Sequence, residues 1–120
     1  MNITIELPWP AKELSPNARP HWAPLAKAKK EARHAAKIMT LVEMVTFLNY
    51  PESKTGRIKL RWTFCPPTRR AYDDDNLESS CKAYRDGIAD ALGIDDSRFK
   101  ATKRTGEVVK GGKIIVSIGD

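Results

Sequence analysis

Apolar and polar residues alternate in two short segments of the chain, and this pattern predicts two β-strands. In residues 2–7, Ile3, Ile5 and Leu7 would lie on one face and polar side chains on the other. Residues 57–64 alternate in the same way, and their outer face is basic. Their apolar positions are Ile58, Leu60, Trp62 and Phe64, and their basic positions are Arg57, Lys59 and Arg61.

Two other segments have the three- and four-residue spacing that is typical of amphipathic helices. The first helix is expected from Leu25 to about Leu48, and the second from about Asn76 to Leu92, with Gly93 as its C-terminal cap. The first apolar stripe consists of Leu25, Ala28, Ala32, Ala35, Met39 and Val42. The second consists of Leu77, Cys81, Tyr84, Ile88 and Leu92. Most such stripes belong to the core.

The remaining segments complete one α+β fold. Residues 11–24 contain three prolines and should form an irregular loop. Residues 104–118 indicate a hairpin that turns at Gly111 and Gly112 and places Ile114, Val116 and Ile118 on its inner face. The order β-α-β-α-β-β predicts a mixed sheet of about four strands packed by two helices. We expect a single domain over residues 1–120.

Composition narrows the class of protein. The chain has 120 residues, 41% of them hydrophobic, which suits one globular domain. Cys65 and Cys81 have neither CxxC spacing nor histidines nearby, so we assign them no metal. No segment has the length of about 20 apolar residues that spans a bilayer. The first residues also lack the pattern of a signal peptide. We therefore expect a cytoplasmic protein without a membrane partner.

The net charge of +6 is unevenly distributed. Residues 73–96 contain eight acids and two bases, whereas the rest of the chain contains nineteen bases and seven acids. The basic remainder would attract a polyanion, and the acidic stretch would repel it unless a divalent cation were bound there. This combination is typical of metal-dependent chemistry on nucleic acids, although an uneven surface charge alone also explains it.

The acidic stretch begins with two aspartates separated by one residue. If the chain is extended here, Asp73 and Asp75 point the same way, and their carboxylates repel each other unless a cation bridges them. Mg²⁺ prefers such oxygen ligands. On the helix that follows, Lys82 faces the same side as Asp75, and Asp95 or Asp96 after Gly93 can fold back toward both.

A purely structural interpretation of these residues stays open. Asp75 and Glu78 also fit a variant of the helix capping box, with Asp75 as the cap. Lys82 and Asp86 have the spacing of a surface ion pair on a helix, and residues 95–96 suit a turn. Spacing alone does not decide between these roles and a metal site.

The acidic motif resembles the central pattern of the RusA family of crossover-junction endodeoxyribonucleases, many of which are encoded by prophages. That pattern is an aspartate, any residue, then Asp-Asn, a helix that carries a lysine, a further aspartate, and a final Asp-Asp. It stands here as Asp73-Asp74-Asp75-Asn76-Leu77, Lys82, Asp86 and Asp95-Asp96. The segments 7–10 and 14–17 and the Gly111–Gly112 turn are also similar, so the resemblance covers nearly the whole chain.

The resemblance implies a Mg²⁺-dependent nuclease that acts as a symmetric homodimer and resolves four-way DNA junctions by paired nicks. It makes Asp73, Asp75 and Asp96 the metal ligands and Lys82 the catalytic lysine, with Asp96 favoured over Asp95. The sequence departs from the pattern at one point. In some members the lysine follows Asp-Asn by one helical turn, whereas Lys82 lies nearly two turns on, which indicates an insertion near residues 79–80.

Several basic residues are candidates for contacts with DNA phosphates. The main candidates are Arg69, Arg70, Lys82, Arg98 and Lys100. Further candidates are the basic face of residues 57–61, Lys103 and Arg104. Two other functions remain as alternatives. One is a DNA-binding module without catalytic activity, and the other is a metal-dependent nuclease that acts on other branched or linear DNA.

Overall fold

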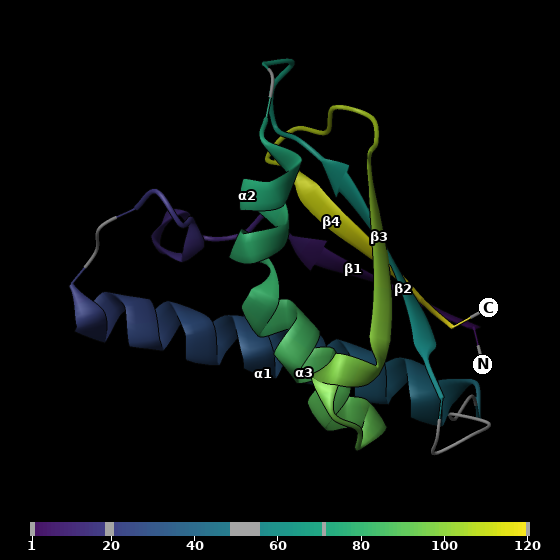
Figure 1. Cartoon of the computed structure of the whole chain (residues 1–120). Helices are drawn as coiled ribbons and strands as arrows, with labels where there is room; N and C mark the ends of the chain where they lie inside the picture. The colour runs from purple at the N-terminus through teal and green to yellow at the C-terminus, as the bar shows by residue number, and fades with distance from the viewer. Residues whose placement is uncertain (1, 19–20, 49–55, 71, 120) are drawn as a thin grey trace.

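Four strands form one mixed sheet in the order β1-β4-β2-β3 (Figure 1). The computed structural model describes residues 2–18, 21–48, 56–70 and 72–119. Its strands are β1 (Asn2–Pro8), β2 (Ile58–Cys65), β3 (Phe99–Thr105) and β4 (Lys113–Gly119). Its helices are α1 (Trp22–Thr46), α2 (Asp74–Ser80) and α3 (Lys82–Leu92), with 3₁₀ turns η1 (Lys12–Leu14) and η2 (Asp96–Arg98). The predicted α+β class with a four-stranded mixed sheet is confirmed.

The period-two pattern places the apolar row of each strand on the same face of the sheet. The β1 residue Ile5 lies beside Val116 of β4, and Val116 lies in turn beside Trp62 of β2. On β3, Phe99 lies beside Ile58 of β2. All five side chains are at most 9% exposed, and they form the sheet side of the core.

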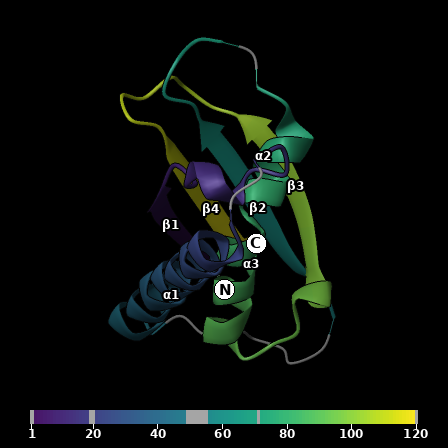
Figure 2. The same cartoon turned by 90° about the vertical axis from the view of Figure 1, so that its left-hand side faces the viewer.

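The three helices cover one side of this sheet (Figure 2). Helix α3 packs closely on α1, because Gly87 has no side chain at the point where the backbone carbonyl of Arg33 approaches it. Beside that contact, the Arg33 guanidinium donates two hydrogen bonds to Asp90, at 2.6 and 2.8 Å. Within the described residues no helix lies on the opposite side of the sheet, whose outward side chains are mostly polar. No helix in the described ranges has the length and apolar character that crossing a membrane would require.

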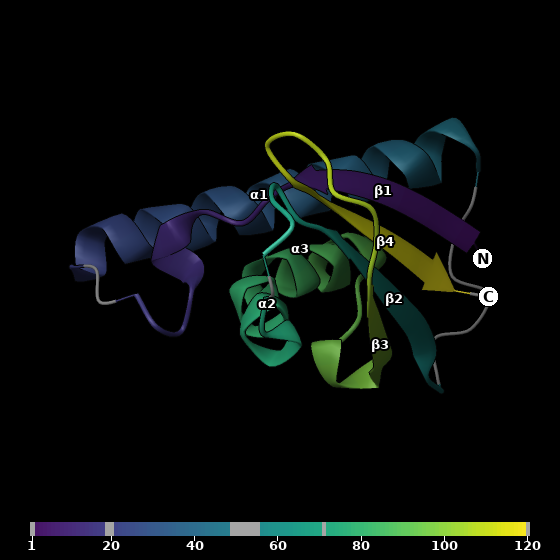
Figure 3. The same ribbon diagram turned by 90° about the horizontal axis from the view of Figure 1, so that it is seen from above.

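The predicted hairpin over residues 104–118 is wrong, because β3 and β4 are not neighbours. Strand β2 lies between them, parallel to β3 and antiparallel to β4 (Figure 3). The connection from β2 through α2 and α3 to β3 is a crossover, which parallel strands require. Gly111 and Gly112 do form a turn with positive φ angles, and residues 114, 116 and 118 are buried as predicted.

The single helix predicted over residues 76–92 is broken at Cys81, where φ is −96° and ψ is 7°. The Ser80 hydroxyl donates a hydrogen bond of 2.8 Å to the backbone carbonyl of Asn76, a contact that commonly bends helices. The apolar stripe of this segment is nevertheless buried throughout, and Gly93 caps α3 with a φ of 69°. The break coincides with the position at which the sequence departs from the RusA pattern.

Helix α1 buries the predicted stripe only in part: Ala32 is buried and Leu25, Ala28 and Ala35 are half-buried. Its buried residues are Ala32, Ala36, Thr40 and Met44, whereas Met39 and Val42 are exposed. Small side chains face α3 because the two helices approach closely. The buried Thr40 hydroxyl donates a hydrogen bond to the backbone carbonyl of Ala36. The helix also begins at Trp22 rather than Leu25, since Pro24 is tolerated in a first turn.

Candidate functional site: a charged groove beside the edge strand

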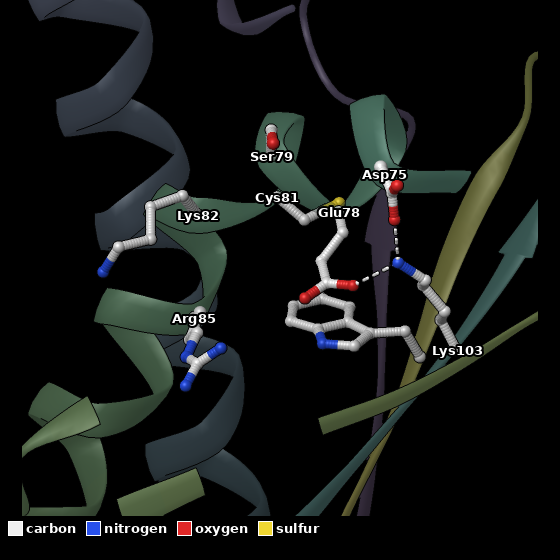
Figure 4. Close-up of a pocket in the computed structure, with 8 residues that line it drawn as sticks. Asp75, Glu78, Ser79, Cys81, Lys82, Arg85 and Lys103 are labelled. Atoms are coloured by element: carbon white, nitrogen blue, oxygen red, sulfur yellow. Dashed lines mark hydrogen bonds and ion pairs between the residues drawn. The ribbon is translucent and has the colours of Figure 1, made fainter. Parts of the chain in front are cut away.

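A groove of about 450 Å³ lies between the α2–α3 segment and strands β2 and β3. Its lining includes two acids, Asp75 and Glu78, and three cations, Lys82, Arg85 and Lys103 (Figure 4). The β2 residue Trp62 also lines it, beside Lys103 in the sheet register. The lining therefore carries both signs of charge and draws on four elements of the fold.

Lys103 bridges two acids of α2, Asp75 and Glu78. It lies on the helix-covered face of edge strand β3, and its ammonium reaches Asp75 at 2.5 Å and Glu78 at 2.9 Å (Figure 4). The hydrogen bond from Lys103 lowers the pKa of the Asp75 carboxyl, and the bonds to Asp75 and Glu78 raise the pKa of Lys103. Both groups are therefore charged at neutral pH.

Lys82 forms a second cluster at the start of α3. Its ammonium contacts Asp86 at 2.5 Å and Asp96 at 2.7 Å. Burial opposes the charge of Lys82, but these hydrogen bonds outweigh it and raise its pKa. The Arg85 guanidinium donates a bond of 3.0 Å to the Asp96 backbone carbonyl, and the hydrogen bond from Lys82 lowers the pKa of the Asp96 carboxyl.

Asp73 caps helix α2, a role that the structural interpretation gave to Asp75. The Asp73 Oδ1 accepts hydrogen bonds from the backbone amides of Asp75 and Asn76, at 2.9 and 3.1 Å. Asp75 is therefore in the first turn of the helix, and the chain is not extended across residues 73–75. As a result, Asp73 lines a separate hollow with Trp9, whereas Asp75 lines the groove.

Asp95 and Asp96 have different roles. The Asp95 carboxylate accepts a hydrogen bond of 2.9 Å from the backbone amide of Ser97, which lowers the Asp95 pKa. Asp96 instead faces Lys82. Of the predicted site residues, the structure thus places Lys82 against Asp96, and both Lys82 and Asp75 at the groove, while Asp73 lies apart from them.

The carboxylates of Asp75 and Asp96 have the donor chemistry of a Mg²⁺ site, because both offer hard oxygen ligands. Each is bonded to a lysine ammonium, so a cation already neutralises it in this structure. Within the described residues, no three acidic, histidine or cysteine side chains are grouped so that they could hold one metal ion. The predicted set of three ligands is therefore not assembled here.

The predicted DNA contacts lie at several places. Arg69 and Arg70 are exposed before α2, and the Arg70 guanidinium lies 4.8 Å from the ring centre of Tyr72. Arg98 donates a bond of 2.9 Å to the backbone carbonyl of Gly56. Lys100 is exposed, and its position in the period-two pattern places it on the opposite sheet face from Lys103.

From the sequence, Lys103 was expected only as a contact with DNA and Glu78 only as part of a capping box, and Arg85 had no assigned role. The signal for Lys103 was the spacing Phe99, Ala101, Lys103, which sets a lysine on the apolar face of a strand. That signal is informative only once β3 is known to lie beside β2. Glu78 and Arg85 follow from the same placement, because α2 and α3 pack over this edge of the sheet.

Comparison with known proteins gave a relative and no family model. The chain is 46% identical over 116 residues to a protein of Xylella fastidiosa (strain Temecula1), which bears the name "Uncharacterized protein". The matched region covers 96% of this chain and 74% of that protein. No family model matches the chain.

Proposed function

Because the chain belongs to the same family as the Xylella fastidiosa protein, whose name states no activity, we propose a function from the residues of the groove. The proposed function is Mg²⁺-dependent hydrolysis of phosphodiester bonds in four-way DNA junctions, by paired nicks. The resemblance of the acidic motif to the RusA family supports the choice of substrate. The proposal includes a cytoplasmic location, where such a substrate is present in bacteria.

One observation carries the proposal: acidic and cationic side chains lie together at a single groove. Asp75 and Lys103 line the groove and contact each other, and Asp96 contacts Lys82, which also lines it. A phosphodiester needs cations to neutralise its oxygens and carboxylates to retain a metal ion. These ion pairs keep both kinds of group charged and close to one another.

Asp75 and Asp96, together with Asp73, are the proposed Mg²⁺ ligands. When bound, the ion would supply Lewis-acid activation of a water molecule and neutralise charge on the phosphate. The two Asp73 hydrogen bonds use Oδ1, so capping the helix leaves its Oδ2 without a hydrogen bond in the described part of the chain. To hold the ion, Asp75 and Asp96 would have to exchange their present lysine partners for it.

Lys82 is the proposed catalytic lysine, because it lines the groove and its ammonium reaches Asp96. An ammonium here stabilises negative charge on the leaving oxygen. Phosphates beside the scissile one are proposed to contact Arg69, Arg70 and Arg98, whereas Lys100, on the opposite face of the sheet from Lys103, would contact DNA away from the groove. These arginines suit phosphate because a guanidinium offers paired donors.

A homodimer is also part of the proposal, since a two-fold junction cut symmetrically needs two related active sites. Exposed apolar side chains on α1 support it. Val42 is 52% exposed and Val45 is 62% exposed, and Phe47 follows directly after the helix at 66%. A contiguous apolar surface of this kind is typical of protein interfaces.

The decisive experiment is incubation of a labelled synthetic four-way junction with the protein, with and without Mg²⁺, followed by mapping of the nicks in each strand. We expect symmetric nicks only in the reactions that contain Mg²⁺. The Asp75→Asn variant should bind the junction and lose at least a hundredfold in cleavage rate, because one ligand oxygen is replaced by an amide. Cleavage by this variant at the wild-type rate would refute the assignment.

Asp73 needs a variant that separates its two roles. Asp73→Asn keeps the helix cap, because asparagine caps as well as aspartate, but it removes a charged metal ligand. We expect wild-type thermal stability with strongly reduced cleavage. If Asp73→Asn cleaves normally, Asp73 is a structural cap only and the proposed ligand set loses a member.

A DNA-binding module without catalysis is the second candidate, and a specific observation favours it. Asp73 and Asp95 act as caps, and Asp75 and Asp96 are paired with lysines, so all four acids already have a structural role. This candidate predicts salt-sensitive binding without Mg²⁺-dependent nicks. Parallel assays on junction, flap and linear duplex substrates would in turn identify a nuclease of different selectivity.

A further inference from the structure

The uncovered face of the sheet carries a second concentration of positive charge, separate from the groove. Its outward residues on β2 include Lys59 and Arg61, and those on β3 include Lys100 and Arg104. All four are exposed, and the register places Lys59 directly beside Lys100. Neither strand contains an acidic residue.

Two of these cations contact neutral groups within the described residues. Arg61 donates to the backbone carbonyl of Gly119 at 3.3 Å, and Arg104 donates to the Thr63 hydroxyl at 3.1 Å. Both acceptors are neutral, so neither of these bonds provides a counterion. The one acidic residue on the outward face of the described strands is Glu6 on β1, and Lys113 on β4 pairs with it at 3.3 Å. The charge is therefore concentrated on the β2–β3 half.

This geometry suits the backbone of a duplex. Outward side chains recur about every 6.7 Å along a strand, and neighbouring strands are about 4.8 Å apart, so the four cations form two rows on an open surface. A membrane surface fits less well, because binding to a bilayer also uses exposed large apolar side chains. Among the described residues, the exposed large apolar side chains lie on α1, directly next to α1 and at Val108. None of them lies on a strand.

We propose that the uncovered β2–β3 face binds the phosphate backbone of double-stranded DNA through Arg61, Lys100 and Arg104, as a surface distinct from the groove. The two surfaces lie on opposite sides of edge strand β3, since Lys103 points to the groove and its neighbours 102 and 104 point away. A DNA arm could thus be held on this face while another segment occupies the groove. The choice of DNA as the polyanion rests on the proposed function.

The test measures binding of a labelled 30-base-pair duplex in EDTA across a series of salt concentrations. The triple variant Arg61→Gln, Lys100→Gln, Arg104→Gln should bind at least tenfold more weakly. The slope of log affinity against log salt should fall by about 2 to 3, since each lost phosphate contact removes about 0.9. The matched control Lys27→Gln, Lys30→Gln, Lys37→Gln removes the same charge from α1 and should keep the wild-type slope. Circular dichroism melting establishes that both variants fold.

A wild-type affinity and slope in the sheet-face variant would overturn the inference, as would an equal loss in the α1 control. Binding to phosphatidylserine vesicles that the sheet-face variant loses, without binding to the duplex, would also overturn it. The outcome is separable from the proposed function, because EDTA prevents metal-dependent cleavage. Duplex binding through this face without any Mg²⁺-dependent nicks would refute the nuclease proposal and leave the inference standing.

Discussion

Lys103 determines how Asp75 behaves, even though 28 positions separate the two residues. Its ammonium bridges the carboxylates of Asp75 and Glu78 from the inner face of an edge strand. The bridge lowers the pKa of Asp75, so the Asp75 carboxyl binds a proton less tightly in the folded protein than in the unfolded chain. The pair therefore stabilises the fold above the ordinary aspartate pKa of about 3.9, and this contribution is lost as pH falls through the lower folded value.

Replacing Lys103 by methionine should raise the Asp75 pKa toward its ordinary value, because the hydrogen bond and the nearby charge are both removed. Carboxyl-carbon NMR titration would measure the change. Lys100→Met, on the other face of the same strand, is the matched control and should leave Asp75 unchanged. An equal rise in both variants would show that overall charge, rather than the bridge, controls this carboxyl.

At the scale of elements, the site depends on where the α2–α3 segment breaks and on how closely α3 approaches α1. The break at Cys81 ends α2 after the turn that carries Asp75 and Glu78, and α3 begins with Lys82. Helix α3 can then lie against α1 because residue 87 is glycine. A β-carbon there would lie 2.1 Å from the backbone carbonyl oxygen of Arg33.

Gly87→Ala should therefore lower the free energy of unfolding by about 3 kcal/mol, because the clash is with backbone and forces the helices apart. Urea denaturation measures this loss. Ala91→Gly, one turn further along α3, creates no clash and should cost only about 1 kcal/mol, mainly through helix propensity. If the Gly87→Ala variant were as stable as the wild type, α1 and α3 could move apart at little cost. Their contact would then not fix the position of Lys82.

At the scale of the whole molecule, helices cover one side of the sheet and the last part of α1 is uncovered. The helix buries a row of small residues against α3 and the sheet and leaves larger ones in solvent, among them Ile38, Val42 and Val45. A lone apolar residue on a surface is ordinary, whereas residues spaced one turn apart form a continuous apolar strip. A second copy of the chain would cover this strip in the proposed homodimer.

The double variant Val42→Lys, Val45→Lys should convert the dimer to a monomer, because it places like charges at the proposed interface. Sedimentation equilibrium gives the mass directly. The control Lys27→Ala, Lys30→Ala on the same helix should leave the mass unchanged. A wild-type protein that is monomeric at high micromolar concentration would contradict the homodimer itself.

The sequence by itself determined the features that depend on local periodicity. The strands at residues 2–8 and 58–65, the buried rows on β4 and α3, and the cap at Gly93 follow from spacing within a few residues, where backbone geometry alone dictates which side chains share a face. The acidic motif was noted from its spacing and its resemblance to a family pattern, but the extended chain expected at Asp73 and Asp75 was wrong, because Asp73 caps α2. The α+β class followed from the order of these elements.

Tertiary structure decided the remaining features because they depend on contacts between distant segments. Strand β3 pairs with β2 rather than β4, and this choice brings Lys103 to Asp75 and Lys100 beside Lys59. Local alternation is the same for a hairpin and for a crossover, so it cannot select the partner strand. The stripe that α1 buries was likewise set by the close approach of α3, since hydrophobicity alone favoured the larger side chains at Met39 and Val42.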